Sequence, residues 1–203
     1  MAGNWVYFGS TTDNTLWALN ALSGKPQWGF TTSAPIRFAP AIVGDRAYVV
    51  SDDGMAYCLN ATTGELIWHF HGGLSDRRLV GNGRMISRWP IRSGVAIKDG
   101  IVHFAVGMWS SEGVYVYGLD ARTGKEIWCN DTNLHYLPMP HASTAHTGNM
   151  PQGYLAIGGD RVVYNNGVGG AWAYDTRTGR ADGRSNGTGT LKKAKGGDYQ
   201  DYG

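Results

Sequence analysis

Short apolar segments alternate with polar turns along most of the chain. Four of these segments cover residues 6–8, 47–50, 101–104 and 161–164, and three further ones cover residues 40–43, 94–97 and 154–157. They are rich in valine, isoleucine and tyrosine, and several end in a pair such as Gly44-Asp45 or Asp99-Gly100. This composition and spacing are typical of antiparallel strands joined by tight turns. The pattern therefore predicts an all-β protein with many short strands.

A sequence unit built around a Ser-Gly or Thr-Gly turn occurs four times. Its glycines are Gly24, Gly64, Gly124 and Gly179, and the first three copies carry Trp28, Trp68 and Trp128 four residues later. The fourth copy lacks the tryptophan, and we expect Arg184 in its place. The glycines are 40, 60 and 55 residues apart. The unit therefore has about 40 residues, and the two later intervals hold insertions of about 20 and 15 residues.

Each position of this unit has a physical role. An asparagine or aspartate four residues before the glycine accepts backbone N–H groups and opens the turn, and the glycine closes it with a positive φ angle. The tryptophan is a large apolar plate with one N–H group, which suits a contact between neighbouring sheets. A small residue begins each copy: Ala18, Cys58, Gly118 and Ala173. Together with the apolar segments, each unit predicts four antiparallel strands, A to D, which form one blade of a β-propeller.

The unit resembles the A-x-D-x-x-T-G-x-x-x-W docking motif of the PQQ-like repeat proteins, where PQQ is pyrroloquinoline quinone. Three full copies and one partial copy extend over residues 6–179. The resemblance implies a propeller of four-stranded blades, often eight of them. Family members range from PQQ-dependent dehydrogenases to the lipoprotein scaffold of the outer-membrane β-barrel assembly machinery, so the fold alone does not define an activity. The resemblance also implies a periplasmic or extracytoplasmic protein, although no signal peptide precedes the first strand.

The blades predicted from the sequence do not complete a propeller. The first blade begins at strand B near Trp5, and the fourth stops after the turn at Gly179, without a strand D. We therefore expect two complete and two partial blades in residues 5–179, and a polar tail rich in glycine and lysine at residues 180–203 that we interpret as a truncated blade. Because closure protects the sheet edges of a propeller, the partners expected are the missing blades of a longer protein, or further copies of the chain.

Two long insertions are the best places for a functional site. Both lie between strand D of one blade and strand A of the next, at residues 71–92 and 131–150. Alternating strand directions place these D–A connections on the same face as the B–C loop at residues 107–113. The candidate binding residues on this rim are Arg77, Arg78, Arg84, Arg88, Trp89, Trp109, Glu112, His135, His141 and His146.

The arginines of the first insertion allow two interpretations. The arginines lie close to Trp89 in the sequence, and Asp76 is the single acid of the insertion. They could therefore bind a carboxylate, a phosphate or an acidic protein surface. They also suit structural roles, in which they pair with acids and stack on tryptophans between blades. The histidines of the second insertion are six and five residues apart, a spacing that matches no metal-binding motif, so we predict no metal site.

Composition narrows the classes of partner. The 203 residues include 18 lysines and arginines and 16 aspartates and glutamates, and this net charge of +2 gives no reason to expect nucleic acid or an anionic membrane as a partner. No segment approaches the roughly 20 apolar residues of a membrane-spanning helix. The two cysteines, Cys58 and Cys129, occupy different positions of the repeat, and we predict that they do not form a disulfide.

Two functions remain open. In the first, the propeller is a non-catalytic binding platform or scaffold, with a protein or a small anionic ligand at the rim, because the sequence carries no recognisable catalytic motif. In the second, which the resemblance implies, the chain is part of a quinoprotein oxidoreductase of the alcohol or sugar dehydrogenase type that binds PQQ with calcium. Those enzymes often have two adjacent cysteines over the cofactor, whereas Cys58 and Cys129 are 71 positions apart. This difference favours the non-catalytic function.

Overall fold

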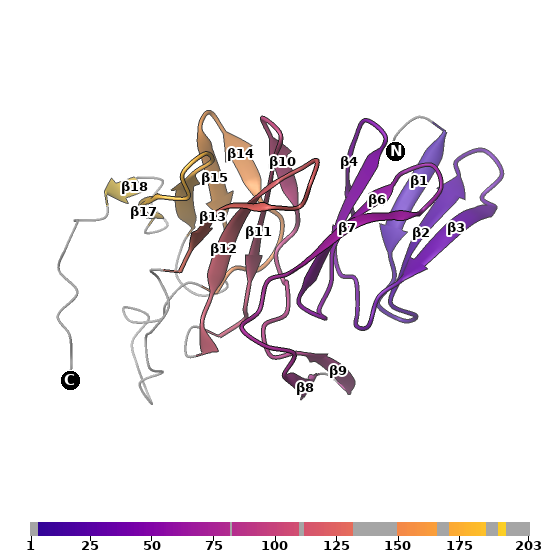
Figure 1. Ribbon diagram of the computed structural model, residues 1–203, viewed down its shortest axis with the longest axis horizontal. Helices are drawn as coiled ribbons and strands as arrows, with labels where there is room; N and C mark the ends of the chain where they lie inside the picture. The colour runs from indigo at the N-terminus through magenta and orange to yellow at the C-terminus, as the bar shows by residue number, and fades with distance from the viewer. Residues whose placement is uncertain are drawn as a thin grey trace.

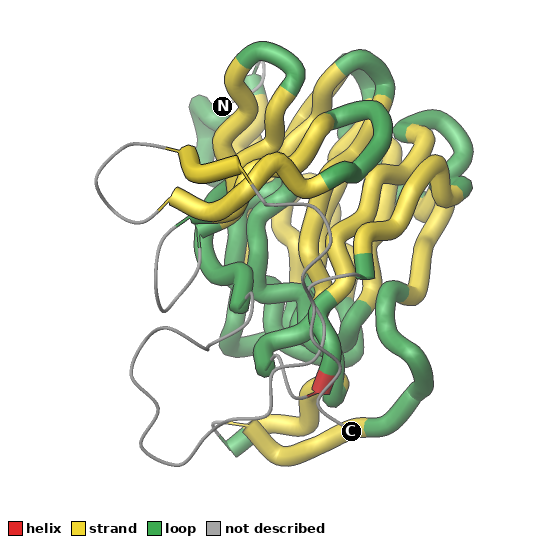
Figure 2. The backbone as a smooth tube through the Cα atoms, turned by 90° about the vertical axis from the view of Figure 1, so that its left-hand side faces the viewer, coloured by secondary structure: helices red, strands yellow, loops and turns green. Residues whose placement is uncertain are grey.

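The structure, a computed structural model, describes residues 4–81, 83–109, 112–131, 150–165, 171–185 and 191–193. Within these residues the regular elements are β-strands, and a single residue, Glu112, has helical geometry (Figure 2). The strands form sheets that stand side by side across the molecule (Figure 1). The expected all-β fold is therefore confirmed. In the described part of the chain, no helix has the length and apolar character needed to span a membrane.

Each sheet is a run of consecutive antiparallel strands (Figure 1). The first sheet contains β1 (Trp5–Gly9), β2 (Thr15–Asn20) and β3 (Pro26–Thr31). The second contains β4 (Ala41–Val43), β5 (Arg46–Val50), β6 (Met55–Asn60) and β7 (Leu66–His71). The third contains β10 (Ala96–Lys98), β11 (Ile101–Val106), β12 (Tyr115–Asp120) and β13 (Glu126–Asn130). The fourth contains β14 (Ala156–Gly158), β15 (Arg161–Tyr164), β16 (Trp172–Asp175), β17 (Ala181–Ser185) and β18 (Leu191–Lys193). A separate hairpin in the first insertion contains β8 (Arg78–Gly81) and β9 (Arg84–Ser87).

The four sheets are successive blades of an incomplete, open β-propeller. The second and third have strands A to D, and within the described residues the first contains strands B to D, as the sequence predicts. The expectation that the fourth blade has no strand D is wrong, because β17 pairs with β16 as its fourth strand and β18 adds a fifth. Strand pairing uses backbone groups, so the polar sequence after Gly179 does not prevent it. Residues 186–190 and 194–203 of the expected tail lie outside the described residues.

The pairing register also corrects the place of the missing tryptophan. In the first three blades the tryptophan of strand D pairs with the small residue of strand C, as Trp68 pairs with Cys58. In the fourth blade Ala173 pairs with Gly183, and Arg184 lies one residue further along. The equivalent of the tryptophan is therefore Gly183 and not Arg184.

Consecutive blades meet at the tryptophans of strand D. The Trp68 ring lies on the Gly124 turn of the next blade, where a Cβ atom would approach the ring to 2.6 Å, and its Nε1 donates a 3.1 Å hydrogen bond to the Ala121 carbonyl. Trp28 and Trp128 make the same contacts with the blades that follow them. Trp68 and Trp128 are buried, and Trp28 is half-buried. The close approach of the ring and a φ angle of +71° explain why the turn at Gly124 carries glycine.

Apolar side chains fill the space between the sheets. The largest cluster, between the second and third blades, includes Tyr48, Val50, Cys58, Phe104 and Leu119. Smaller clusters join the first blade to the second and the third to the fourth. Cys58 and Cys129 are both free thiols. Burial raises the pKa of Cys129 to about 11, which keeps this thiol in its unreactive protonated form.

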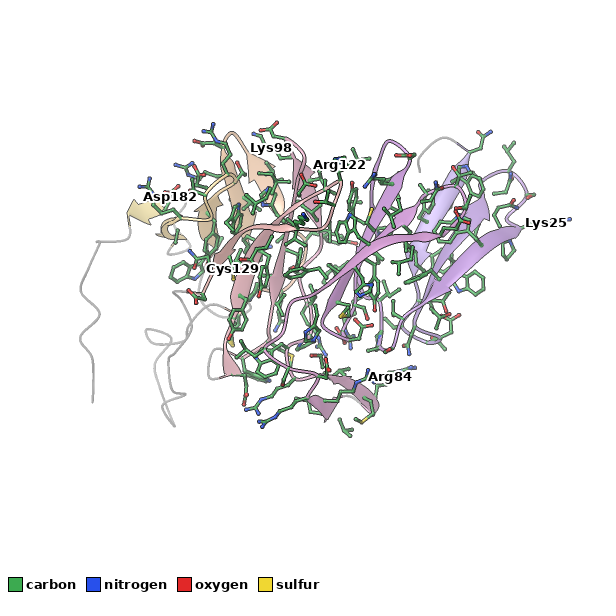
Figure 3. The ribbon with its side chains drawn as sticks, viewed as in Figure 1. Lys25, Arg84, Lys98, Arg122, Cys129 and Asp182 are labelled. Carbon is green, nitrogen blue, oxygen red and sulfur yellow. The ribbon has the colours of Figure 1, made fainter. Side chains whose placement is uncertain are left out.

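The two ends of the blades carry different connections. Arg122 and Lys98 mark the end with the C–D and A–B turns, and Arg84 marks the opposite end, where the D–A insertion lies (Figure 3). The B–C loop that contains Glu112 contacts this insertion through Trp89. The D–A insertion and the B–C loop thus share one face, as the alternation of strand directions requires.

Candidate binding site

Arg88 and Trp89 anchor the first insertion to the neighbouring B–C loop. The Arg88 guanidinium forms an ion pair with the Glu112 carboxylate and lies 5.5 Å from the centre of the Trp89 ring. Trp89 Nε1 donates a 2.6 Å hydrogen bond to the Glu112 carbonyl oxygen. The structure therefore brings these three sequence-predicted residues together. They bind one another and hold the insertion on the rim of the propeller.

The hairpin of β8 and β9 comes directly before this anchor in the chain. Its register pairs Leu79 with Ile86 and Val80 with Met85. Because side chains alternate along a strand, the two pairs lie on opposite faces of the hairpin. Ile86 is 1% exposed, whereas Val80 and Met85 are 72% and 51% exposed. One face therefore packs on the blades, and the other presents an apolar pair to solvent.

Three arginines of the hairpin region are accessible from solvent. Arg77, Arg78 and Arg84 are exposed, and within the described residues none of them forms an ion pair. Arg84 donates an exposed hydrogen bond to the Thr12 carbonyl in the B–C loop of the first blade. The exposed part of the insertion consequently carries an excess of positive charge.

A polar cavity of about 350 Å³ lies between the second blade and the hairpin of the insertion. Its wall comes from the second blade, from the insertion and from the connection between the first and second blades, and the lining residues are Ser33, Asp53, Met55, Tyr57, His71, Asp76, Arg78 and Ser87. Of the sequence-predicted site residues, Arg78 lines this cavity. The other wall residues belong to none of the motifs above, and the folding of the insertion against the second blade brings most of them together.

Asp53 is the fixed acceptor of the cavity wall. Its Oδ2 accepts hydrogen bonds from the Ser33 backbone N–H at 3.0 Å and from the Tyr57 hydroxyl at 2.8 Å. Its Oδ1 accepts a 3.0 Å hydrogen bond from the Met55 backbone N–H. Burial, and then the neighbouring Asp53 carboxylate, raise the pKa of Tyr57, so its hydroxyl remains a donor. Since a carboxylate has about four acceptor positions, Asp53 is held in place and still has room for a ligand donor.

A second charged cluster, which the sequence analysis missed, joins two D–A connections. Asp52 is fully buried, and its two oxygens accept hydrogen bonds from Arg37 Nε at 2.7 Å and from Arg92 Nε at 3.2 Å. Burial raises the pKa of Asp52, and the two arginines oppose this shift. The sequence signal is the tripeptide Pro-Ile-Arg, which ends once at Arg37 and again at Arg92. Arg92 therefore has a structural partner.

The other residues that the sequence predicted for the site are Trp109 and three histidines, and the described structure does not bring them into contact with the insertion. Trp109 is 54% exposed in the B–C loop, and its carbonyl accepts a hydrogen bond from the Glu112 backbone N–H. His135, His141 and His146 lie outside the described residues.

The described residues do not fit a calcium-bound quinone. They contain no group of three or more histidine, cysteine, aspartate or glutamate side chains placed to hold a metal ion. Cys58 is buried opposite Trp68 in the contact between two blades, and Cys129 lies in the third blade, so the two thiols are not an adjacent pair. No step through PQQ follows from these residues.

Comparison with known proteins decides the family. The family model described as outer membrane protein assembly factor BamB matches residues 1–184. The chain belongs to this PQQ-like propeller family. One curated relative of the PQQ-like chain is a polyvinylalcohol dehydrogenase from Pseudomonas sp, 29% identical over 129 residues, which are 62% of this chain and 18% of the relative. Another is a tetrathionate hydrolase from Acidithiobacillus ferrooxidans, 28% identical over 116 residues, or 57% of this chain and 19% of the relative.

Solved structures share the fold of the PQQ-like chain. BamB from Moraxella catarrhalis superposes with a TM-score of 0.62 at 18% identity, over 89% of this chain and 49% of BamB. A quinohemoprotein alcohol dehydrogenase from Comamonas testosteroni gives 0.69 at 14% identity, over 90% of this chain and 33% of the dehydrogenase. At these identities the likeness shows the fold alone. The PQQ-like chain spans less than a fifth of the two curated relatives and about half of BamB.

Proposed function

We propose that this PQQ-like chain is a non-catalytic binding or scaffold propeller that binds an acidic protein surface at the rim formed by its first D–A insertion. The observation that carries this proposal is the hairpin of β8 and β9. It exposes Val80 and Met85 on one face together with Arg78, it also exposes Arg77 and Arg84, and none of these arginines is ion-paired within the described residues.

The hairpin has the composition of a protein-binding surface. Interfaces are enriched in arginine and methionine, and their affinity comes mainly from central side chains that lose water on binding. Val80 and Met85 are paired across the hairpin, and Arg78 lies on the same face of β8, two residues before Val80. A partner with an apolar residue surrounded by carboxylates would match this face, because arginine and carboxylate pair with two parallel hydrogen bonds.

The anchor of the insertion supports a binding role for the hairpin. Arg88 and Trp89 fix its base to Glu112, and Ile86 is buried against the blades. A surface that is already held in its bound shape loses less conformational freedom when a partner binds. The hairpin is therefore suited to present its exposed face to a partner.

The family supports a role in protein assembly outside the cytoplasm. The family model that matches the chain describes an assembly factor for outer membrane proteins, and BamB is also among its structural relatives. We infer that the chain works in an extracytoplasmic compartment and that its partners include proteins of an assembly complex.

Charge reversal on the hairpin tests the proposed surface. The variant Arg78→Glu/Arg84→Glu should bind a fluorescent peptide of alternating glutamate and leucine about tenfold more weakly at low salt, and the difference should shrink as salt screens the charges. The control Arg122→Glu/Lys125→Glu changes two exposed charges at the opposite end of the third blade (Figure 3). Fluorescence anisotropy gives both affinities. Equal affinities for the two variants would exclude the hairpin as the binding surface.

The relatives also favour a second candidate function, that of a part of a PQQ-dependent oxidoreductase. A polyvinylalcohol dehydrogenase and a quinohemoprotein alcohol dehydrogenase are among them. Titration of the protein with PQQ and calcium, followed by absorbance, distinguishes the two candidates. A saturable spectral change would support the oxidoreductase, and an unchanged quinone spectrum would support the non-catalytic function.

A further inference from the structure

The repeat provides an internal comparison for the cavity between the second blade and the insertion. Met55 of β6 corresponds to Tyr115 of β12, and Tyr57 corresponds to Tyr117. Tyr115 is 8% exposed, and the Tyr117 hydroxyl donates a 3.1 Å hydrogen bond to the Gly72 carbonyl at the start of the first insertion. In the second blade a shorter methionine stands at the position of the buried tyrosine and forms part of the cavity wall. The cavity thus depends on side chains in which this blade differs from the next one.

The wall of the cavity has hydrogen-bonding groups of both kinds. Asp53 and Asp76 supply acceptors, and Arg78 and His71 supply donors. An anionic ligand would face the two carboxylates, and a cationic ligand would face the guanidinium. A neutral ligand avoids both repulsions and can still use every one of these groups. The charges of the wall therefore favour an uncharged ligand that is rich in both donors and acceptors.

We infer that this cavity binds a neutral polyhydroxyl molecule about the size of a monosaccharide. Neighbouring hydroxyl groups can donate to the two oxygens of a carboxylate and accept from the N–H groups of a guanidinium. Met55 and the Tyr57 ring, which packs edge-on against Phe30 at 5.3 Å, offer apolar surface for the C–H face of such a molecule. The volume of about 350 Å³ lies at the small end of the roughly 300–1,000 Å³ range of ligand sites.

Filling the cavity is the direct test. D-glucose is the neutral probe, and glucosamine and glucuronate are its cationic and anionic counterparts, with binding measured by ligand-observed NMR. Glucose should bind in preference to both. The variant Met55→Tyr should weaken glucose binding at least about tenfold, because the new side chain occupies the cavity. This variant copies the residue that the third blade carries at the same position.

Tyr115→Met is the matched control, since it makes the reverse change in the third blade and should leave glucose binding unchanged. If Met55→Tyr does not fold, Ser33→Trp narrows the cavity from an exposed position and keeps the backbone N–H that Asp53 accepts. Unaltered glucose binding by the folded filling variant, or binding of a charged sugar alone, or no binding of any probe, would each overturn the inference. Arg78 belongs to both sites, but Met55 and Ser33 are no part of the proposed protein-binding surface, so the cavity-filling variants test this inference separately from the proposed function.

Discussion

The contact between blades depends on donors that converge on a single carbonyl group. The Tyr48 hydroxyl and Trp68 Nε1 both donate hydrogen bonds of 3.1 Å to the Ala121 carbonyl of the next blade. The first blade makes the same pair of bonds to the second. In the third blade His103 stands where the other two have tyrosine, and in the described structure neither of its buried ring nitrogens has a hydrogen-bond partner. Protonation of His103 would place an unpaired charge in the contact between the third and fourth blades and would consequently weaken it.

We predict that stability falls as the pH decreases from about 6.5 to about 4. Burial lowers the pKa of His103 to about 4, whereas the unfolded chain takes up the proton near pH 6.5. The stabilisation from neutral His103 is therefore present above pH 6.5 and is lost as the pH falls through this window, by roughly 3 kcal/mol at most. Urea denaturation at a series of pH values measures the effect. A variant His103→Phe should lose this part of the pH dependence, and an unchanged profile would contradict the assignment to His103.

Replacing Trp68 by alanine should destabilise the protein by roughly 3–5 kcal/mol. The substitution removes a buried ring that lies on Gly124 and a hydrogen bond to the neighbouring blade. Urea denaturation of the variant gives the free energy of unfolding. Trp28→Ala is the matched comparison and should cost less, because Trp28 is only half-buried. A loss well below about 1 kcal/mol for Trp68→Ala would show that this tryptophan does not hold the blades together.

The hairpin of β8 and β9 depends on its anchor more than the blades do. We predict that Arg88→Ala speeds amide hydrogen exchange in residues 78–87 and lowers global stability by less than about 1 kcal/mol, because the pair with Glu112 is partly exposed. Hydrogen-exchange mass spectrometry separates the two effects. Arg84→Ala is the control, since Arg84 makes only an exposed contact in the described structure. Equal exchange in the two variants would show that Arg88 is not the anchor.

The sequence predicted the elements whose pattern is local and missed those that depend on packing. The blade strands follow from apolar segments and from turns such as the one at Gly124, and these signals survive without tertiary contacts. The hairpin was missed because arginines interrupt its apolar alternation, and β17 was missed because its residues are poor strand formers that need β16 beside them. The cavity wall was not predictable, because Ser33, Asp53 and Arg78 lie in three separate connections or insertions that meet only in the folded chain.

Each apolar cluster in the described structure joins one blade to the next blade in sequence. Separate apolar clusters join the first blade to the second, the second to the third and the third to the fourth. In such arrays stability is a sum of the units and the contacts between neighbours. The substitution Trp68→Ala weakens the contact between the second and third blades. We predict that in this variant the first two blades and the last two unfold locally as separate units. Hydrogen exchange in β6 and β12 should then report different opening free energies, and equal values in the variant would contradict this prediction.

All three tryptophan contacts have the same direction along the chain. The blade that comes earlier contributes the ring, and the blade that follows contributes the glycine turn and the carbonyl that accepts the hydrogen bond. At this contact, every unit that carries both parts therefore matches any other such unit. A gene that gains or loses one whole unit of about 40 residues brings together surfaces that already match. Blade number in such a protein can change by duplication or deletion of DNA without a compensating substitution at this contact.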